Sequence, residues 1–147
     1  MLEVIDNGPW DRSLLEPGPV DREYFEAAAQ GKLVIQQCPV CAYTQFPPKM
    51  LCVSCGGDPQ WIETSGTGEI YTFTIVRRHG VEPFATLAPF VLAMIDIPEG
   101  VRFMGNVTNI DVETVHVGLA VEAYSLRIDE NMALPLWRPS ESYRSGA

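Results

Sequence analysis

The sequence predicts a mainly β protein, and three observations carry this prediction. Twelve glycines and twelve prolines among 147 residues suit short strands and turns better than a bundle of helices. Four cysteines form two Cys-X2-Cys pairs, which is the pattern of a small metal-binding unit. From Ser65 onward, short apolar segments are separated by turn residues, as in a small β-barrel. We therefore expect an N-terminal helix, a rubredoxin-like zinc ribbon and a C-terminal five-stranded barrel of the OB-fold type.

Composition and charge exclude several classes of protein. A hydrophobic fraction of 46% is enough for a core, so we exclude global disorder. The formal net charge is −9, which disfavours general binding to nucleic acids or anionic membranes, because both repel an acidic surface. The N-terminus lacks the basic and apolar regions of a signal peptide, and the best apolar run, residues 88–95, is far shorter than the ~20 residues of a membrane span. We expect a cytoplasmic protein.

Residues 1–31 are predicted to form an irregular arm followed by a short helix. Two interpretations of the arm stay open: it is flexible, or it is an extended segment that docks on a partner through Trp10. Asp21 is placed to cap the helix through its carboxylate, Tyr24 begins an apolar face, and Gly31 is a natural end. Since so short a helix is marginally stable alone, we expect it to lie on this chain or on another one.

Residues 32–62 are predicted to form the zinc ribbon. Its four thiols, Cys38, Cys41, Cys52 and Cys55, have the spacing Cys-X2-Cys, ten residues, Cys-X2-Cys. Each tight knuckle can bring two thiolates to one ion, and two knuckles complete the tetrahedron that zinc prefers. Two disulfides are one alternative, which a reducing compartment disfavours, and a redox pair would need a thioredoxin-like context that is missing. Because four thiolates leave no open coordination position, we expect the zinc to be structural.

Residues 63–138 are predicted to form the barrel, and residues 139–147 a polar tail. The expected strands are Glu69–Arg77, Phe90–Ile97, Val101–Val107, Gly118–Ile128 and Leu134–Trp137. An immunoglobulin-like sandwich would need about seven strands, so the number favours the smaller OB-type barrel. Within the first strand, alternation predicts that Tyr71 faces the same way as Phe73 and Ile75.

No set of side chains in the sequence points to catalysis. The two histidines, His79 and His116, are far apart and have no nucleophile nearby, and the zinc would occupy all four thiolates. No catalytic residue is therefore predicted, and we expect that the chain alone is not an enzyme. Arg77, Arg78 and Lys49 are candidate contacts to phosphate groups, because a few cations can hold phosphates even on an acidic protein.

Landmarks of a known family occur in order along residues 20–138. They are Tyr24-Phe25, Gly31-Lys32-Leu33, Cys38-Pro39-Val40-Cys41, Pro47-Pro48-Lys49, Cys52-Val53-Ser54-Cys55-Gly56, Gly66-Thr67-Gly68-Glu69-Ile70-Tyr71, Pro89-Phe90-Val91, Glu99-Gly100-Val101-Arg102, Gly118-Leu119-Ala120-Val121-Glu122 and Leu134-Pro135-Leu136-Trp137. On these motifs the chain resembles the DUF35 family, the zinc-ribbon-plus-OB-fold proteins that accompany thiolase-like enzymes. One departure is Ala42, which follows the first knuckle where the family usually has glycine, so some backbone strain is expected there.

The resemblance implies an accessory subunit. Family members bind a thiolase-fold partner that supplies the catalytic cysteine and histidines, and the barrel holds or channels an acyl-CoA toward that active site. The implied reactions are carbon–carbon bond formation or cleavage, of the thiolase or retro-aldolase kind, and acyl transfer. Arg77, Arg78 and Lys49 would then contact the phosphates of a CoA thioester, and the aromatic helix and the proline loop would form a docking surface.

A single-stranded nucleic-acid-binding module is the alternative function. Zinc ribbons and OB barrels both commonly bind nucleic acid, and such a module needs a basic groove with stacking aromatic residues. The central barrel strands, with Asp96 and Arg102, offer little basic charge. We therefore expect no nucleic-acid partner and no membrane partner.

Overall fold

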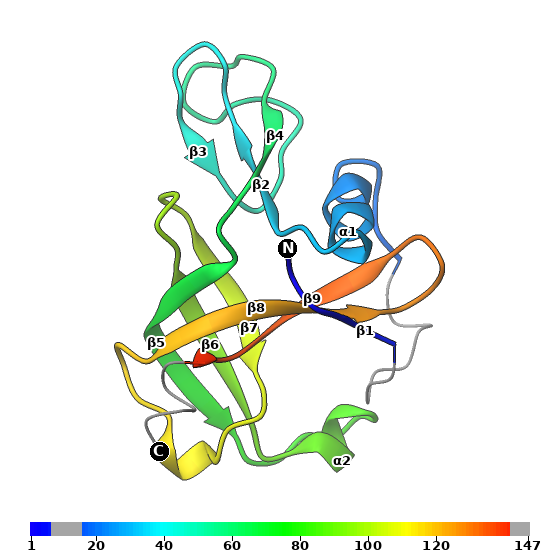
Figure 1. Ribbon diagram of the computed structural model, residues 1–147, viewed down its shortest axis with the longest axis vertical. Coiled ribbons are helices and arrows are strands. Elements are labelled where there is room, and N and C mark those ends of the chain that lie inside the picture. Colours follow the sequence, from blue (N-terminus) through cyan, green and yellow to red (C-terminus); the bar gives the residue numbers. More distant parts are fainter. Residues whose placement is uncertain (7–15, 142–147) are drawn as a thin grey trace.

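Two sheets lie one above the other along the long axis of the molecule, and a helix lies beside their junction (Figure 1). The computed structural model describes residues 1–6 and 16–141. Trp10, through which the arm was expected to dock, and residues 142–147 of the tail lie outside the described residues. Helices in the described part are too short and too polar to span a membrane.

Five strands close into a barrel in the lower part of the molecule (Figure 1). They are β5 (Thr67–Val76), β6 (Phe90–Asp96), β7 (Arg102–Val107), β8 (Ala120–Arg127) and β9 (Ala133–Pro139). Their order is β8-β5-β6-β7-β9, and antiparallel pairing of β8 with β9 joins the two ends. β7 and β9 meet in parallel, and the other neighbouring strands of the barrel are antiparallel. This closed arrangement confirms the predicted five-stranded OB-fold barrel.

Alternating side chains of the strands fill the barrel. On β6, Val91, Ala93 and Ile95 are almost fully buried, and the residues between them face outward and are half-buried. Phe103 of β7 and Trp137 of β9 are the largest side chains of this core. The interior is therefore a packed hydrophobic core that needs no metal of its own.

A bulge in β5 overturns one predicted orientation. The register with β6 shifts between Ile70 and Thr72, so that one extra residue stands on β5. Ile70 is buried and Tyr71 is exposed, whereas Phe73 and Ile75 pack against the core as predicted. The prediction for Tyr71 is wrong because a bulged residue breaks the alternation of the two faces.

The start of the arm forms a short strand. β1 (Val4–Ile5) pairs in parallel with β8 at Ser125 and Leu126, beyond the point at which β5 leaves β8. The arm was expected to be irregular, and that expectation is wrong for these residues. β8 has a free edge there, and an extended segment satisfies the backbone groups of that edge.

The upper sheet is the ribbon. It has the order β3-β2-β4, with β2 (Val34–Gln37), β3 (Thr44–Gln45) and β4 (Gln60–Glu63) all antiparallel. The predicted boundary between ribbon and barrel, at residues 62 and 63, stays a prediction.

The N-terminal helix is α1 (Arg22–Ala29), where the sequence predicts it. Gly31 ends it with a positive φ of 78°. The expected cap by Asp21 is wrong, because the Asp21 carboxylate makes no hydrogen bond to the first turn. Its backbone already has helical angles, and the carbonyl of Gly18 accepts from the N–H groups of Asp21 and Arg22 instead.

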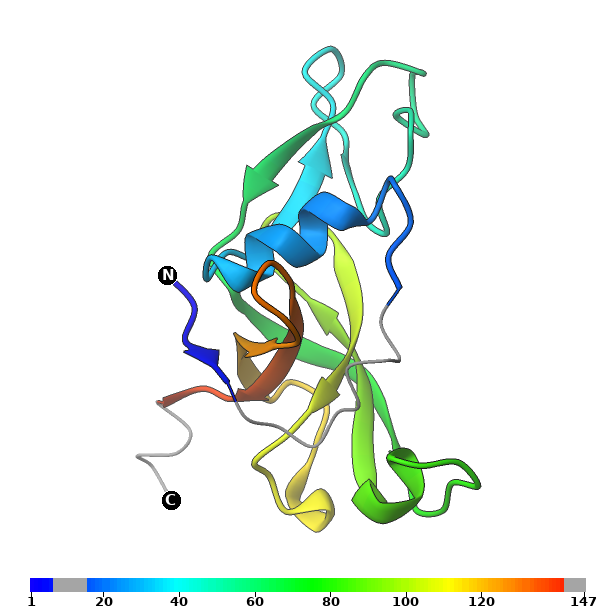
Figure 2. The ribbon, with the colours of Figure 1, turned by 90° about the vertical axis from the view of Figure 1, so that its right-hand side faces the viewer.

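Aromatic rings hold the helix, the ribbon and the barrel together. Figure 2 shows α1 lying across the junction of the two sheets. The ring of Tyr24 lies 5.0 Å from that of Phe46 in the ribbon, and Phe46 lies 4.3 Å from Phe103 in the barrel. The helix therefore lies on its own chain, and the expectation that its aromatic face forms a docking surface is wrong for Tyr24, which is buried.

Two short helical turns lie at the end of the barrel away from the ribbon (Figure 1). α2 (Phe84–Leu87) lies within the expected loop between β5 and β6. η2 (Val112–Thr114) follows β7, and the carboxylate of Asp111 caps it by accepting from the N–H of Glu113 at 3.0 Å. These turns form the walls of a cavity described below.

Candidate metal centre and ligand site

The first knuckle of the ribbon is closed by two backbone hydrogen bonds. The N–H of Ala42 donates to the carbonyl of Cys38 at 2.8 Å, and the N–H of Cys38 donates to the carbonyl of Tyr43 at 2.9 Å. Ala42 has a φ of 65°, in the left-handed region, as its place after the knuckle predicts. For a residue with a Cβ this conformation costs about 1 kcal/mol.

The second knuckle repeats the first. The N–H of Gly56 donates to the carbonyl of Cys52 at 2.9 Å, and the N–H of Cys52 donates to the carbonyl of Gly57 at 2.8 Å. Gly56 takes the left-handed position without strain, with a φ of 79°. At Gly57 a Cβ would lie only 2.9 Å from Sγ of Cys38, so glycine is needed for the two knuckles to meet.

The two knuckles bring the four thiols together. All four Sγ atoms lie within 4.8 Å of one another, with 3.5 Å between Cys38 and Cys55 and 3.7 Å between Cys41 and Cys52. Four sulfurs at about 2.3 Å from one zinc ion stand roughly 3.8 Å apart. The set therefore fits tetrahedral zinc, and its four thiolates leave no position for a substrate, as expected for a structural site.

Backbone amides favour the thiolate form of two of these cysteines. Hydrogen bonding from the N–H of Cys41 lowers the pKa of Cys38. In the same way, the N–H of Cys55 lowers the pKa of Cys52 to about 7. Each of these two thiols is buried, so the backbone supplies the stabilisation of negative charge that water would otherwise give.

The three candidate phosphate contacts do not form one site. Lys49 is exposed on the ribbon, beside the turn between β6 and β7. Arg77 and Arg78 follow the far end of β5, and Arg77 donates to Glu113 at 3.0 Å. Between Glu69, which is opposite that turn, and Arg77, the strand spans roughly 25 Å. Lys49 and the two arginines therefore cannot face the same phosphate group.

A cavity of about 400 Å³ opens at the end of the barrel that carries α2 and η2. Its walls are mostly apolar and come from the α2 loop, the start of β6, the segment between β7 and η2, and strands β1, β8 and β9. They include Leu87, Phe90 and Val112, with Asn106 and Tyr124 as polar members. Glu113, the partner of Arg77, is the neighbour of Val112, so a cation lies close to the rim. A volume of this size suits a small organic ligand.

The sequence alone does not predict this cavity. Its walls come from segments that are far apart in the chain, and none of them has a recognisable motif. The only sequence signal close to it is the pair Arg77-Arg78 at a predicted strand end.

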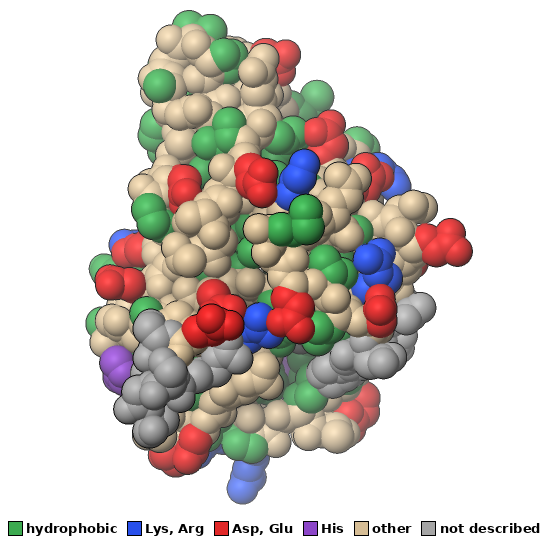
Figure 3. Space-filling model, in the orientation of Figure 1, with side chains coloured by type: hydrophobic (Ala, Val, Ile, Leu, Met, Phe, Trp, Pro, Cys, Tyr) green, Lys and Arg blue, Asp and Glu red, His purple; other side chains and the backbone are tan. Residues whose placement is uncertain are grey.

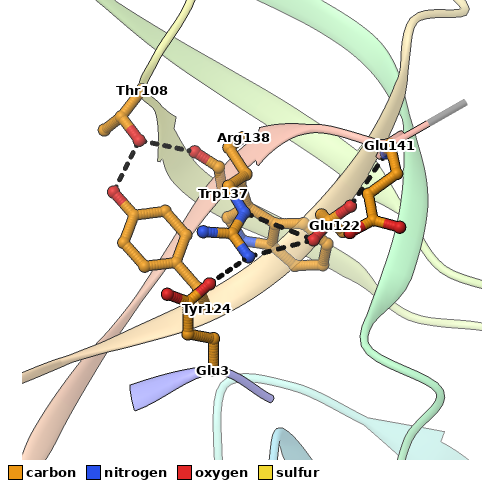
Figure 4. Close-up of polar contacts among 7 residues, drawn as sticks. All are labelled: Glu3, Thr108, Glu122, Tyr124, Trp137, Arg138 and Glu141. Atoms are coloured by element: carbon orange, nitrogen blue, oxygen red, sulfur yellow. Dashed lines mark hydrogen bonds and ion pairs between the residues drawn. The ribbon is translucent and has the colours of Figure 1, made fainter. Parts of the chain in front are cut away.

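A polar network fixes Tyr124 in the cavity wall (Figure 4). The hydroxyl of Thr108 donates to the carbonyl of Trp137 at 3.0 Å, so it accepts from the hydroxyl of Tyr124 at 2.6 Å. The guanidinium of Arg138 lies 4.9 Å from the Tyr124 ring centre. Burial raises the pKa of Tyr124, which keeps the phenol neutral.

Arg138 ties three strands together behind that wall. It donates to Glu3 beside β1 at 2.7 Å and to Glu122 of β8 at 3.1 Å, and it belongs itself to β9 (Figure 4). Its side chain is only 13% exposed. The network is thus a structural support that holds the cavity wall in place.

Neither histidine forms a catalytic pair within the described residues. Nδ1 of His79 contacts the backbone of Val81, and Nδ1 of His116 contacts the carbonyl of Val117. Both rings are exposed. The expectation that the chain supplies no catalytic residues stays a prediction.

The outer face of the central barrel strands gives little support to nucleic-acid binding. The guanidinium of Arg102 donates twice to the carboxylate of Asp96, and it stacks at 3.5 Å on the ring of Tyr71. The pairing lowers the pKa of Asp96, so that carboxylate stays charged beside the arginine. A phosphate would have to displace it.

Comparison with known families divides the chain in two. Residues 25–60 match the family model described as the rubredoxin-like zinc ribbon domain of ChsH2. Residues 61–125 match the C-terminal OB-fold domain of ChsH2.

Similar proteins include DUF35 scaffold proteins and subunits of larger enzymes. A "DUF35 domain-containing scaffold protein" of Methanocaldococcus jannaschii is 34% identical over 120 residues, which cover 80% of this chain and 84% of that protein. A "probable enoyl-CoA hydratase alpha subunit" of Thermomonospora curvata is 36% identical over 131 residues. That match covers 86% of this chain, but the chain spans only 40% of the length of the hydratase subunit.

Among solved structures, the chain is similar to one described as the "Ltp2-ChsH2(DUF35) aldolase". The two are 32% identical with a TM-score of 0.75. The match covers 85% of this chain and 98% of that chain, so it includes both the ribbon and the barrel.

Proposed function

The chain belongs to the DUF35 family, and from this premise we propose that it is a non-catalytic accessory subunit of a thiolase-like enzyme complex that handles acyl-CoA thioesters. The partner would supply the catalytic residues. The reaction would form or cleave a carbon–carbon bond or transfer an acyl group, and the complex would work in the cytoplasm.

One observation carries the proposal: the match to the DUF35 chain of the Ltp2-ChsH2 aldolase, which extends over nearly all of that chain. An aldolase named after two components supports a function within a hetero-oligomer. The hydratase activity in the name of the Thermomonospora relative is not transferred, because this chain spans less than half of that subunit.

The cavity at the end of the barrel supports the acyl-CoA part of the proposal. Its apolar walls suit the acyl group of a thioester. Arg77 and Arg78 would hold the CoA phosphates beside its rim, since Arg77 already binds a carboxylate there. Lys49 lies at the other end of β5 and would contact a different part of the complex.

The proposed zinc has a structural role. It would be held by Cys38, Cys41, Cys52 and Cys55, and it would keep the ribbon folded. The chemistry that zinc supplies in such a site is the cross-linking of the two knuckles. In this proposal no step of the reaction takes place at the ion.

Co-expression with a thiolase-fold protein of the same source organism tests the proposal. A complex should appear by gel filtration with light scattering, and calorimetry should detect octanoyl-CoA binding to that complex. Arg77→Gln with Arg78→Gln should weaken binding by about tenfold, which corresponds to about 1.4 kcal/mol. Arg22→Gln, on the exposed face of α1, is the control. A chain that forms no complex, or that converts acyl-CoA by itself, would overturn the proposal.

A further inference from the structure

The tip of the ribbon exposes apolar side chains on a surface with a single charged residue. Lys49 is the only charged residue between positions 38 and 57. The exposed apolar side chains of this segment, called here the apolar ribbon face, are Val40, Tyr43, Met50, Leu51 and Val53. Figure 3 shows the ribbon end of this view mostly tan and green, while red and blue side chains gather over the barrel. Surface of this kind marks a site of protein contact.

A shallow groove of about 300 Å³ runs from this face to the barrel. Tyr43, Val53 and Lys49 line its ribbon side, and Val101 and Arg102 line its barrel side. The groove therefore combines apolar side chains with a cation whose ammonium lies at the surface. It could receive an apolar side chain of a partner and place a partner carboxylate next to Lys49.

Two buried glutamines hold the ribbon face in one conformation. The side chain of Gln36 bonds both backbone groups of Lys49, at 2.8 and 2.9 Å. Gln45 accepts from the N–H of Val53 at 3.0 Å and donates to Gln36 at 2.8 Å. Since the loop is already ordered, a partner would pay little conformational entropy on binding it.

The distribution of charge selects the kind of partner. With one lysine in positions 38–57 and a formal net charge of −9, all of the net negative charge lies outside the ribbon tip. If two copies met through their ribbons, the acidic remainders of the two chains would repel each other. An anionic lipid surface would repel this acidic part of the chain as well. A different protein, with an apolar face and an acidic side chain, meets neither penalty.

We propose that the apolar ribbon face, centred on Tyr43 and Val53, is the surface by which this chain docks on its partner enzyme, through an apolar patch with a carboxylate opposite Lys49. This inference rests on the proposed function, since it names the surface used by the proposed complex. Binding would be driven by burial of the apolar side chains, and Lys49 would set orientation and speed of association.

The affinity of the co-expressed complex tests the inference. Val53→Asp and Tyr43→Asp should each weaken it by about 30-fold, the size of a binding hot spot. Lys49→Glu should slow association and reduce its dependence on salt. Val117→Asp is the matched control, because Val117 is equally exposed but belongs to the segment before β8 and not to the ribbon. It should leave the affinity unchanged.

Each variant is checked for an intact ribbon by its metal content and melting temperature. Where Val53→Asp fails this check, Met50→Ser with Leu51→Ser replaces it, because both of those side chains are exposed. Ribbon variants that bind the partner like the wild type would overturn this inference and leave the proposed function standing. A wild-type chain that binds no thiolase-fold protein would overturn both. If the isolated chain dimerises and Val53→Asp makes it monomeric, a second copy of the chain binds the apolar ribbon face. That result would overturn the inference.

Discussion

Removal of the metal should unfold the ribbon tip and leave the barrel folded. Between positions 38 and 57, the buried side chains are those of Cys38, Gln45, Pro48 and Cys52, so the tip has almost no hydrophobic core. The side chains of Gln36 and Gln45 make five hydrogen bonds that hold the tip, and each contributes about 1 kcal/mol net. A structural zinc contributes about 10–16 kcal/mol near neutral pH. The metal is therefore the larger contribution by at least twofold, and the tip should open without it.

The barrel has a different source of stability. Its core is a continuous cluster of buried apolar residues that includes Ile95, Phe103 and Trp137. Burial of each such side chain contributes about 1.5–3 kcal/mol, independently of the metal. Loss of the ion should thus act locally.

Hydrogen exchange with mass spectrometry, together with elemental analysis, measures this outcome. Chelation, or Cys38→Ala, should expose the amides of Cys38, Ala42, Cys52 and Gly56, whose hydrogen bonds close the knuckles. The amides of β5 to β8 should stay protected. Ser54→Ala, an exposed change inside the second knuckle, is the control. A metal-free protein with protected knuckles, or a barrel that unfolds together with the ribbon, would refute the reasoning.

Three further changes test the packing of the barrel and of the helix that lies on it. Arg138→Met should lower the free energy of unfolding in urea by about 2 kcal/mol, a value between those of exposed and buried ion pairs. Arg102→Met should barely shift the unfolding midpoint, because its ion pair with Asp96 is exposed to water. Equal unfolding midpoints for the two variants would contradict this. Gly105→Ala should cost about 1–3 kcal/mol, since its Cβ would lie 2.7 Å from the buried indole ring of β9, while Gly80→Ala meets no neighbour and serves as the control. Burial raises the pKa of Tyr24, so the folded state favours the neutral phenol and the free energy of unfolding should fall as the pH rises above about 10. Tyr24→Phe should make this fall with pH less steep. An unchanged pH dependence of the free energy of unfolding, measured in urea, would count against this prediction.

The cysteine cluster and the barrel strands could be predicted from the sequence because each signal is local. Two residues between paired cysteines determine a knuckle, and Ala42 has the left-handed backbone that its position after the first knuckle implies. The five barrel strands fall within a few residues of their predicted ranges, since alternation of apolar residues depends on neighbours in the sequence.

Contacts between distant segments decided the rest. The bulge that turns Tyr71 outward arises from the pairing of β5 with β6, and β1 forms because β8 has a free edge. The cavity, and the support that Arg138 gives to its wall, join strands from both ends of the chain. The separation of Lys49 from Arg77 follows from the length of β5. The sequence by itself therefore determined which four thiols form the zinc-ribbon cluster and which residues form strands. Only the tertiary structure decided which surfaces lie together, because spatial neighbours far apart in the chain leave no local pattern.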